Sequence, residues 1–102
     1  MKHSSKINLV SKTYVVDAIG QRIATDVLKE IWCDFKSVSG QEFAQAGANG
    51  IKARFVFAIW EKEYNNETEL IFDGVAYSIY RTYSRDDGRI ELYTEKRVGV
   101  DE

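Results

Sequence analysis

The sequence predicts an all-β fold, a small antiparallel β-barrel or sandwich of about six strands with one short helix between strands two and three. Aromatic residues make up 13% of the chain, and strands favour aromatic and β-branched side chains. The chain has seven glycines and no proline, and Gly, Asn and Asp separate its short apolar runs. It contains no pair of long amphipathic segments, which a ferredoxin-like α+β fold requires.

Two long strands joined by a tight loop are expected first. Residues 7–16 form one strand, because apolar and polar side chains alternate there before a β-branched run. Residues 17–21 form a hairpin loop in which Gly20 is free to adopt a positive φ. Residues 22–38 form the second strand, which is long enough to bend or to carry a bulge.

The latter half of the second strand has one apolar face. Its side chains are expected to alternate between the inside and the outside of the sheet. Cys33 lies on the apolar side, where it is expected to act as a small buried hydrophobic residue. The apolar side carries Ile31, Cys33 and Phe35, and the other side carries Trp32, Asp34 and Lys36.

The alternation stops at residues 39–50, where a short helix is expected. Ser39 and Glu42 have the spacing of a capping box, with Ser39 as N-cap and Glu42 reaching back to it. Gly47 is a natural C-cap, and residues 49–50, Asn-Gly, form a turn.

The same segment is unusual in composition. Residues 39–51 carry one charge, Glu42, although the average composition of the chain predicts about four. Long, weakly charged loops are commonly functional, so one interpretation is a loop that orders against a neighbouring subunit or a passing ligand. The other interpretation is a helical connector whose Phe43 plugs the end of the barrel.

The remaining strands are shorter. Residues 51–60 give the clearest signal, and their second half is apolar on both faces, as in a central strand or one that a partner covers. Asp73-Gly74 is a type I′ hairpin signal. The return strand is expected to carry Val75, Tyr77, Ile79 and Tyr83 on one face. The expected elements are a polar loop at 61–68, strands at 69–72, 75–83 and 89–96, and a turn at 84–88.

One domain, residues 1–102, accounts for the whole chain, with flexible ends expected at 1–6 and 97–102. The first residues are polar and lack the apolar stretch of a secretory signal. No apolar run is long enough for a transmembrane helix. The protein is therefore expected in the cytosol of the cell that makes it, or in an assembly built there.

Composition also excludes several kinds of site. With one cysteine, Cys33, and one histidine, His3, the chain has no intramolecular disulfide and no closed zinc site, and no metal or cofactor is expected. The carboxylates form no convincing catalytic pair, and neither a phosphate-binding glycine loop nor a nucleophile elbow is present. The sequence therefore predicts a protein that is not an enzyme.

Four aromatic residues are candidates for a subunit interface. Their positions place them on faces that do not form the core, where Tyr and Trp supply much binding energy at low entropic cost. The alternative is cross-strand pairing on a solvated face. The four are Trp32, Trp60, Tyr80 and Tyr93.

An oligonucleotide-binding barrel is a further alternative. Basic and aromatic residues are interleaved along the later strands, but acidic residues lie among them and the net charge is −2. Nucleic-acid binding is therefore the less favoured hypothesis. The residues concerned are Lys52, Arg54, Phe55, Trp60, Tyr80, Arg81, Tyr83 and Arg85.

Four motifs in order resemble the head–tail joining, or head closure, proteins of tailed phages. The run WCDFKSVSGQEFAQAG (residues 32–47) is similar to an aromatic-rich strand that enters a Val-Ser-x-x-Glu-Phe-x-x-Ala-Gly-like segment in that family. The family's next strand is matched by FVFAIW (55–60), its Gly hairpin by FDGVAYSI (72–79) and its terminal strand by RIELY (89–93). The resemblance covers residues 7–99.

The resemblance implies a structural virion protein of the head–tail connector, assembled in the host cytoplasm. Such proteins form a homo-oligomeric ring, typically twelvefold, with the portal or adaptor protein above and a tail protein below. The ring closes the DNA exit channel after packaging, touches packaged double-stranded DNA transiently and docks the tail; no membrane is involved. A neighbouring connector component, an adaptor or a tail-completion protein, is the alternative role.

The family's gating element lies between the second and third strands. By resemblance, the channel or gating loop comprises Ser39, Gly40, Gln41, Glu42, Phe43, Ala44, Gln45, Ala46, Gly47, Ala48, Asn49 and Gly50. This is the segment that composition also distinguishes. Small, nearly uncharged residues suit a loop that packs against its own copies and touches DNA without gripping it. We expect the loop to be mobile in the free subunit and to order on assembly.

Overall fold

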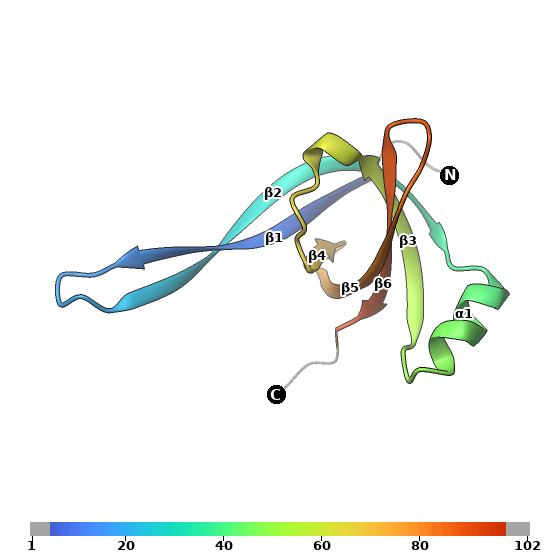
Figure 1. Ribbon diagram of the computed structural model, residues 1–102, viewed down its shortest axis with the longest axis horizontal. Helices are drawn as coiled ribbons and strands as arrows, with labels where there is room; N and C mark the ends of the chain where they lie inside the picture. Colours follow the sequence, from blue (N-terminus) through green and yellow to red (C-terminus); the bar gives the residue numbers. More distant parts are fainter. Residues whose placement is uncertain (1–4, 98–102) are drawn as a thin grey trace.

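The computed structural model describes residues 5–97, which form a closed barrel of six antiparallel strands in the order β1-β2-β3-β6-β5-β4 (Figure 1). A short helix, α1, lies between β2 and β3, as the sequence predicts. The elements are β1 (Ser5–Val16), β2 (Arg22–Ser37), α1 (Gly40–Gly47), β3 (Ala53–Trp60), the 3-10 turn η1 (Glu61–Glu63), β4 (Glu69–Phe72), β5 (Val75–Ser84) and β6 (Arg89–Lys96).

The core of the barrel is apolar and rich in aromatic rings. Every second side chain of a strand points inward, which buries residues such as Leu9, Phe57 and Leu92 completely. Phe72 is partly buried and packs against this core, with its ring centroid 4.9 Å from that of Phe35 and 5.1 Å from that of Phe57. These edge and tilted contacts add to the free energy gained from burying the rings.

Cys33 is buried in the core, as predicted for a small apolar residue. Burial raises the pKa of its thiol to about 11. The thiol is therefore protonated at neutral pH and has little of the thiolate character that reactive cysteines need.

The hairpin of β1 and β2 extends far beyond the barrel (Figure 1). The two strands pair continuously from Ser5 opposite Cys33 to Val16 opposite Arg22. However, β1 pairs with β4 only over residues 8–10, and β2 pairs with β3 only over residues 34–37. Residues 11–27 therefore form a two-stranded projection, here called the arm, and the molecule measures 51 Å along its longest axis.

The tip of the arm is a well-capped turn. The Asp17 carboxylate accepts hydrogen bonds from the backbone N–H groups of Ile19 and Gln21, at 3.0 and 2.9 Å. Gly20 adopts a φ of +88°, as the sequence predicts for this loop. The hairpin was expected from sequence, but its departure from the barrel was not.

The β5–β6 pair departs from the predicted alternation. Its register shifts between Ile79 and Arg81, so that Tyr80 is an extra residue on β5. A bulge of one residue reverses the faces of all later side chains. Tyr83, expected on the core face with Ile79, therefore lies outside the barrel opposite Glu91, and that expectation was wrong.

The type I′ turn at Asp73-Gly74 is confirmed by φ values of +53° and +77°. Three residues of the predicted flexible ends, Ser5, Lys6 and Arg97, lie within the described range. Ser5 and Lys6 belong to β1, and the backbone N–H of Arg97 donates to the carbonyl of Ala76 at 3.0 Å. The rest of the predicted flexible ends, residues 1–4 and 98–102, lies outside the described residues.

Candidate functional site

Helix α1 is the element that the sequence singles out most strongly. Its N-terminus is formed as predicted, because the Ser39 hydroxyl accepts a hydrogen bond from the backbone N–H of Glu42 at 3.1 Å. The C-terminus differs from the prediction. Gly47 is still helical, Ala48 is the C-cap, and Gly50 takes the positive φ of +77°.

The side chain of Glu42 does not reach back to the N-cap, contrary to the capping-box prediction. Its carboxylate instead accepts a hydrogen bond from the Tyr80 hydroxyl at 2.6 Å and from the Arg81 guanidinium at 2.5 and 3.3 Å. The guanidinium also lies 3.8 Å from the centre of the Tyr93 ring. We call these four residues, Glu42, Tyr80, Arg81 and Tyr93, the α1 latch, because they fasten the helix to β5 and β6.

The bulge in β5 makes the latch possible. In a regular strand, consecutive side chains point to opposite faces. The extra residue at Tyr80 lets both Tyr80 and Arg81 turn toward α1. A shallow pocket of about 230 Å³ lies beneath the helix, lined by Glu42, Gln45, Ala46, Asn49, Ile51, Tyr80 and Arg81.

The latch is electrostatically matched at neutral pH. The pKa of the Glu42 carboxyl is lowered, chiefly by the hydrogen bond that it accepts from Arg81. The pKa of Tyr80 is raised, first by burial and then by its hydrogen bond to the Glu42 carboxylate. Glu42 is therefore an ionised acceptor and Tyr80 a neutral donor. The Tyr93 hydroxyl is also engaged, donating to Glu91 at 2.7 Å.

Phe43 does not plug the end of the barrel, so that interpretation of the loop was wrong. Its side chain is 45% exposed, and Ala46 is the buried apolar residue of the helix. The helix thus rests on the barrel through a small side chain and through the latch. Phe43, the largest apolar residue of residues 39–50, faces solvent.

The four aromatic residues predicted at an interface divide into two pairs. Tyr80 and Tyr93 belong to the α1 latch, with ring centroids 6.4 Å apart. Trp32 and Trp60 are exposed on the outer face of the barrel, and Tyr83 lies on that face as well. We call Trp32, Trp60 and Tyr83 the aromatic patch.

The charges around the aromatic patch are paired within the chain. Arg89 lies 4.9 Å from the centre of the Trp60 ring and donates to the Asp34 carboxylate at 2.9 Å and to the Ala58 carbonyl at 3.1 Å. Asp34 lies on the side of β2 that carries Trp32 and Lys36, as predicted, and it is buried there. Arg85 forms an ion pair with Asp87 at 2.7 Å.

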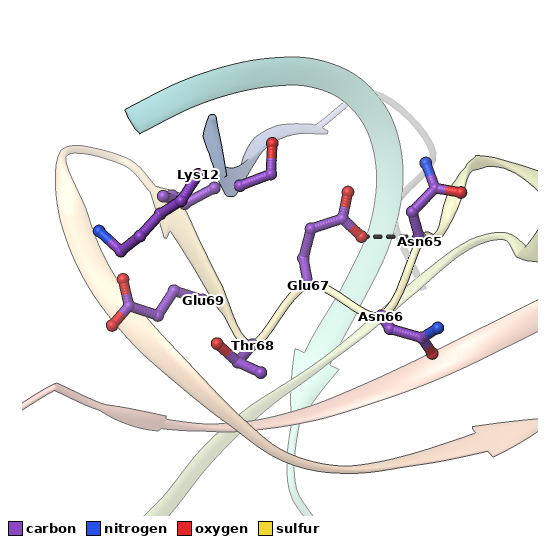
Figure 2. A pocket seen from close by; sticks show the side chains of 8 residues that line it. Lys12, Asn65, Asn66, Glu67, Thr68 and Glu69 are labelled. Atoms are coloured by element: carbon purple, nitrogen blue, oxygen red, sulfur yellow. Dashed lines mark hydrogen bonds between the residues drawn. The ribbon is translucent and has the colours of Figure 1, made fainter. Parts of the chain in front are cut away.

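A second pocket lies at the root of the arm, where the 65–69 segment meets β1 (Figure 2). Its volume is about 260 Å³. The Glu67 carboxylate, at its centre, accepts a hydrogen bond from the backbone N–H of Asn65 at 2.7 Å and so holds the loop in place. Lys12 is paired with Asp26 at 2.7 Å. Glu67 and Lys12 thus bind other groups of the same chain, and they do not point together at a site that could hold a ligand.

Within residues 5–97, no group of three or more His, Cys, Asp or Glu side chains is placed to hold a metal ion. In the same range, no helix is long and apolar enough to span a membrane.

Comparison with known proteins gives a family and a fold. A family model described as "Phage head completion protein" matches residues 2–98. The solution structure of a protein from Shigella flexneri 2a is similar, with a TM-score of 0.75 and 16% identity over 99% of this chain and 96% of that chain. At that identity the likeness shows the fold alone. No curated protein matches the sequence.

Proposed function

Because the chain belongs to the phage head completion protein family, a family of structural virion proteins that join head and tail, we propose that it closes the DNA exit channel of the filled head. In this proposal its copies form a ring, typically twelvefold, beneath the portal or adaptor protein. The ring also offers the surface on which the tail docks. Assembly takes place in the host cytoplasm, and the protein then resides in the head–tail connector.

The observation that carries the proposal is the near absence of charge in residues 39–50. Their one charged side chain, Glu42, is neutralised by Arg81. A segment that has no basic side chain and whose one carboxylate is already paired makes few of the phosphate contacts that hold DNA strongly and non-specifically. Such a segment suits a barrier that touches DNA and releases it on ejection.

Phe43 supports the same role. An exposed aromatic side chain on a helix of small residues is placed to contact its own copies when the helices gather around an axis. Helix α1 is formed in the single chain, and Glu42 fastens it to Tyr80 and Arg81. We therefore propose that a preformed helix moves as a unit when the α1 latch opens, and that the latch holds it in the free subunit.

The charge pairing also bears on the alternative functions. A nucleic-acid-binding barrel requires available basic groups, but Arg81 and Arg85, two of the four basic residues named for that hypothesis, each pair with a carboxylate in this chain. An adaptor or a tail-completion protein remains the alternative within the connector. Position in the particle distinguishes those roles.

The test is deletion of the gene in its phage, followed by electron microscopy of the lysate and measurement of DNA in the heads. Free tails beside tailless heads that have lost their DNA support channel closure. Tailless heads that stay full show a role in tail docking below another barrier. Normal infectious virions contradict both roles.

A point variant separates closure from joining. We expect Phe43→Ala to give particles that retain the ring but lose DNA, because the barrier lacks its largest apolar contact. Gln41→Ala, which changes another exposed residue of α1, is the matched control and should leave the DNA content unchanged. Equal DNA retention in both variants contradicts the assignment of α1 as the barrier.

A further inference from the structure

The arm has a face that its own chain leaves uncovered. The alternation that buries Ile7 and Leu9 inside the barrel continues along β1 and β2 into the arm. Six side chains follow on this face, none of them charged and five of them β-branched. We call Ser11, Thr13, Val15, Ile23, Thr25 and Val27 the inward row.

The opposite face of the arm is different in chemistry. There Lys12 pairs with Asp26 at 2.7 Å, and the guanidinium of Arg22 lies 4.7 Å from the centre of the Tyr14 ring. That face pairs its charges within the arm, and it also exposes the side chains of Tyr14 and Val16. The inward row differs in that it carries no charged side chain, and Val15 is 51% exposed. β-Branched residues on a pleated surface gain stability when a second surface covers them.

The aromatic patch of a second copy is the surface that fits the inward row. Trp32, Trp60 and Tyr83 are exposed, and the neighbouring arginines are compensated by Asp34 and Asp87. Because the row is uncharged and the arginines of the patch are already paired, contact between the two surfaces buries apolar area without leaving an ion unpaired. The arm points away from the barrel, so it does not reach the patch of its own chain (Figure 1).

We propose that the arm is the clasp between neighbouring subunits: the inward row of one copy covers the aromatic patch of the next. This inference rests on the proposed ring and names its interface. Two different surfaces meet, so the contact is heterologous, and repetition around an axis closes a ring in which every subunit gives one arm and receives one.

The size of the arm sets the strength of a single contact. Two strands are about 10 Å wide, and residues 11–16 span about 20 Å, which gives a face of about 200 Å². A stable pair of proteins buries about 800 Å² on each partner. One clasp is therefore weak, and free subunits are expected to be monomeric until many clasps form together on a template.

Two adjacent valines provide a matched test. Val15 lies on the inward row, whereas Val16 lies on the opposite face at the same distance from the barrel, and both are exposed. We expect Val15→Asp to fold normally by circular dichroism, but to lower incorporation into particles and infective titre by about tenfold or more, because the clasp would bury an unpaired charge. Val16→Asp should behave like the wild type. Equal incorporation of the two variants overturns the proposal.

Photo-crosslinking identifies the occupant. With p-benzoylphenylalanine in place of Val15, assembled particles should give a product of twice the 11.7 kDa subunit, attached to a peptide that contains Trp32, Trp60 or Tyr83. A product with a different protein, or a stronger homodimer from position 16, overturns the proposal. Crosslinking of the purified protein at millimolar concentration tests the clasp without the virion. A gene deletion without phenotype therefore refutes the proposed function and leaves this result standing.

Discussion

The barrel and the arm are built from the same two strands, yet their side chains meet different conditions. In β1, Leu9 is fully buried by its own chain, whereas Val15, six residues further on the same face, is half exposed. The alternation does not change between them. What changes is whether a second strand pairs with β1, because β4 pairs with it over only three residues. Patterning thus marks a face for burial, and the topology decides whether the same chain buries it.

Truncation of a core side chain should show the largest contrast. We expect Phe57→Ala to lower the free energy of unfolding by about 3–5 kcal/mol, because Phe57 is fully buried among aromatic rings. Ile23→Ala in the arm should change it by less than about 0.5 kcal/mol, because that side chain is already exposed. Urea denaturation of the two purified variants measures both values. A similar loss in both would mean that the arm is packed in the free subunit.

Removal of one hydroxyl from the α1 latch should have an intermediate effect. Tyr80→Phe keeps the ring but removes the donor to Glu42. We expect the free energy that fastens α1 to the barrel to fall by about 0.5–1.5 kcal/mol. The loss should be local, because the latch fastens only α1. Hydrogen exchange should therefore accelerate at the amides of residues 43–50 and stay unchanged in β1 and β6.

Tyr83→Phe is the control for that experiment, because Tyr83 lies on the same strand but outside the latch. Its exchange pattern should match that of the wild type. Rapid exchange throughout residues 43–50 in the wild-type free subunit would instead support the prediction of a loop that is mobile before assembly.

The latch should also depend on pH in a defined direction. The pKa of Glu42 is lowered in the folded protein, so its contribution is present above the unfolded value near 4.5 and is lost as the pH falls through the folded value. The pKa of Tyr80 is raised, so its contribution is present below the unfolded value near 10 and is lost as the pH rises above it. Protection of the α1 amides should therefore decline at both extremes.

Glu42→Gln tests the acid limb. The variant has no carboxyl to titrate at position 42. Protection of the α1 amides should therefore be lower at neutral pH than in the wild type, and it should no longer fall between about pH 5 and 3. If protection falls in acid in the same way in the variant and the wild type, another carboxylate causes the decline.

Local chemistry accounts for much of what the sequence predicted. Ser39 was identified as an N-cap because the cap is satisfied within three residues, by the N–H of Glu42. Gly20 and Asp73-Gly74 were identified because their turns require positive φ values. Each of these features depends on neighbours in the sequence and needs no knowledge of the rest of the fold.

Features that depend on register were missed. The partner of Glu42 is set by a bulge at Tyr80, and a bulge does not follow from an alternating pattern. The same bulge moved Tyr83 to the outer face. The arm did have a signal in the sequence: strands expected at 7–16 and 22–38 are much longer than the neighbouring one at 69–72, so part of the hairpin had to lack a partner.

The smallest expected effect on the urea midpoint concerns the tip of the arm. Gly20→Ala places a Cβ at a φ of +88°, which costs about 1–2 kcal/mol for a residue other than glycine. Among the described residues other than its two chain neighbours, none has a heavy atom within 4 Å of that Cβ, so the cost is one of backbone strain and not of collision. We expect it to appear as faster hydrogen exchange at residues 13–25, with almost no change in the urea midpoint, because the tip opens without the barrel. A clear fall in the midpoint would show that the arm unfolds together with the barrel, and would remove the distinction between a surface that the chain buries and one that it reserves for another copy.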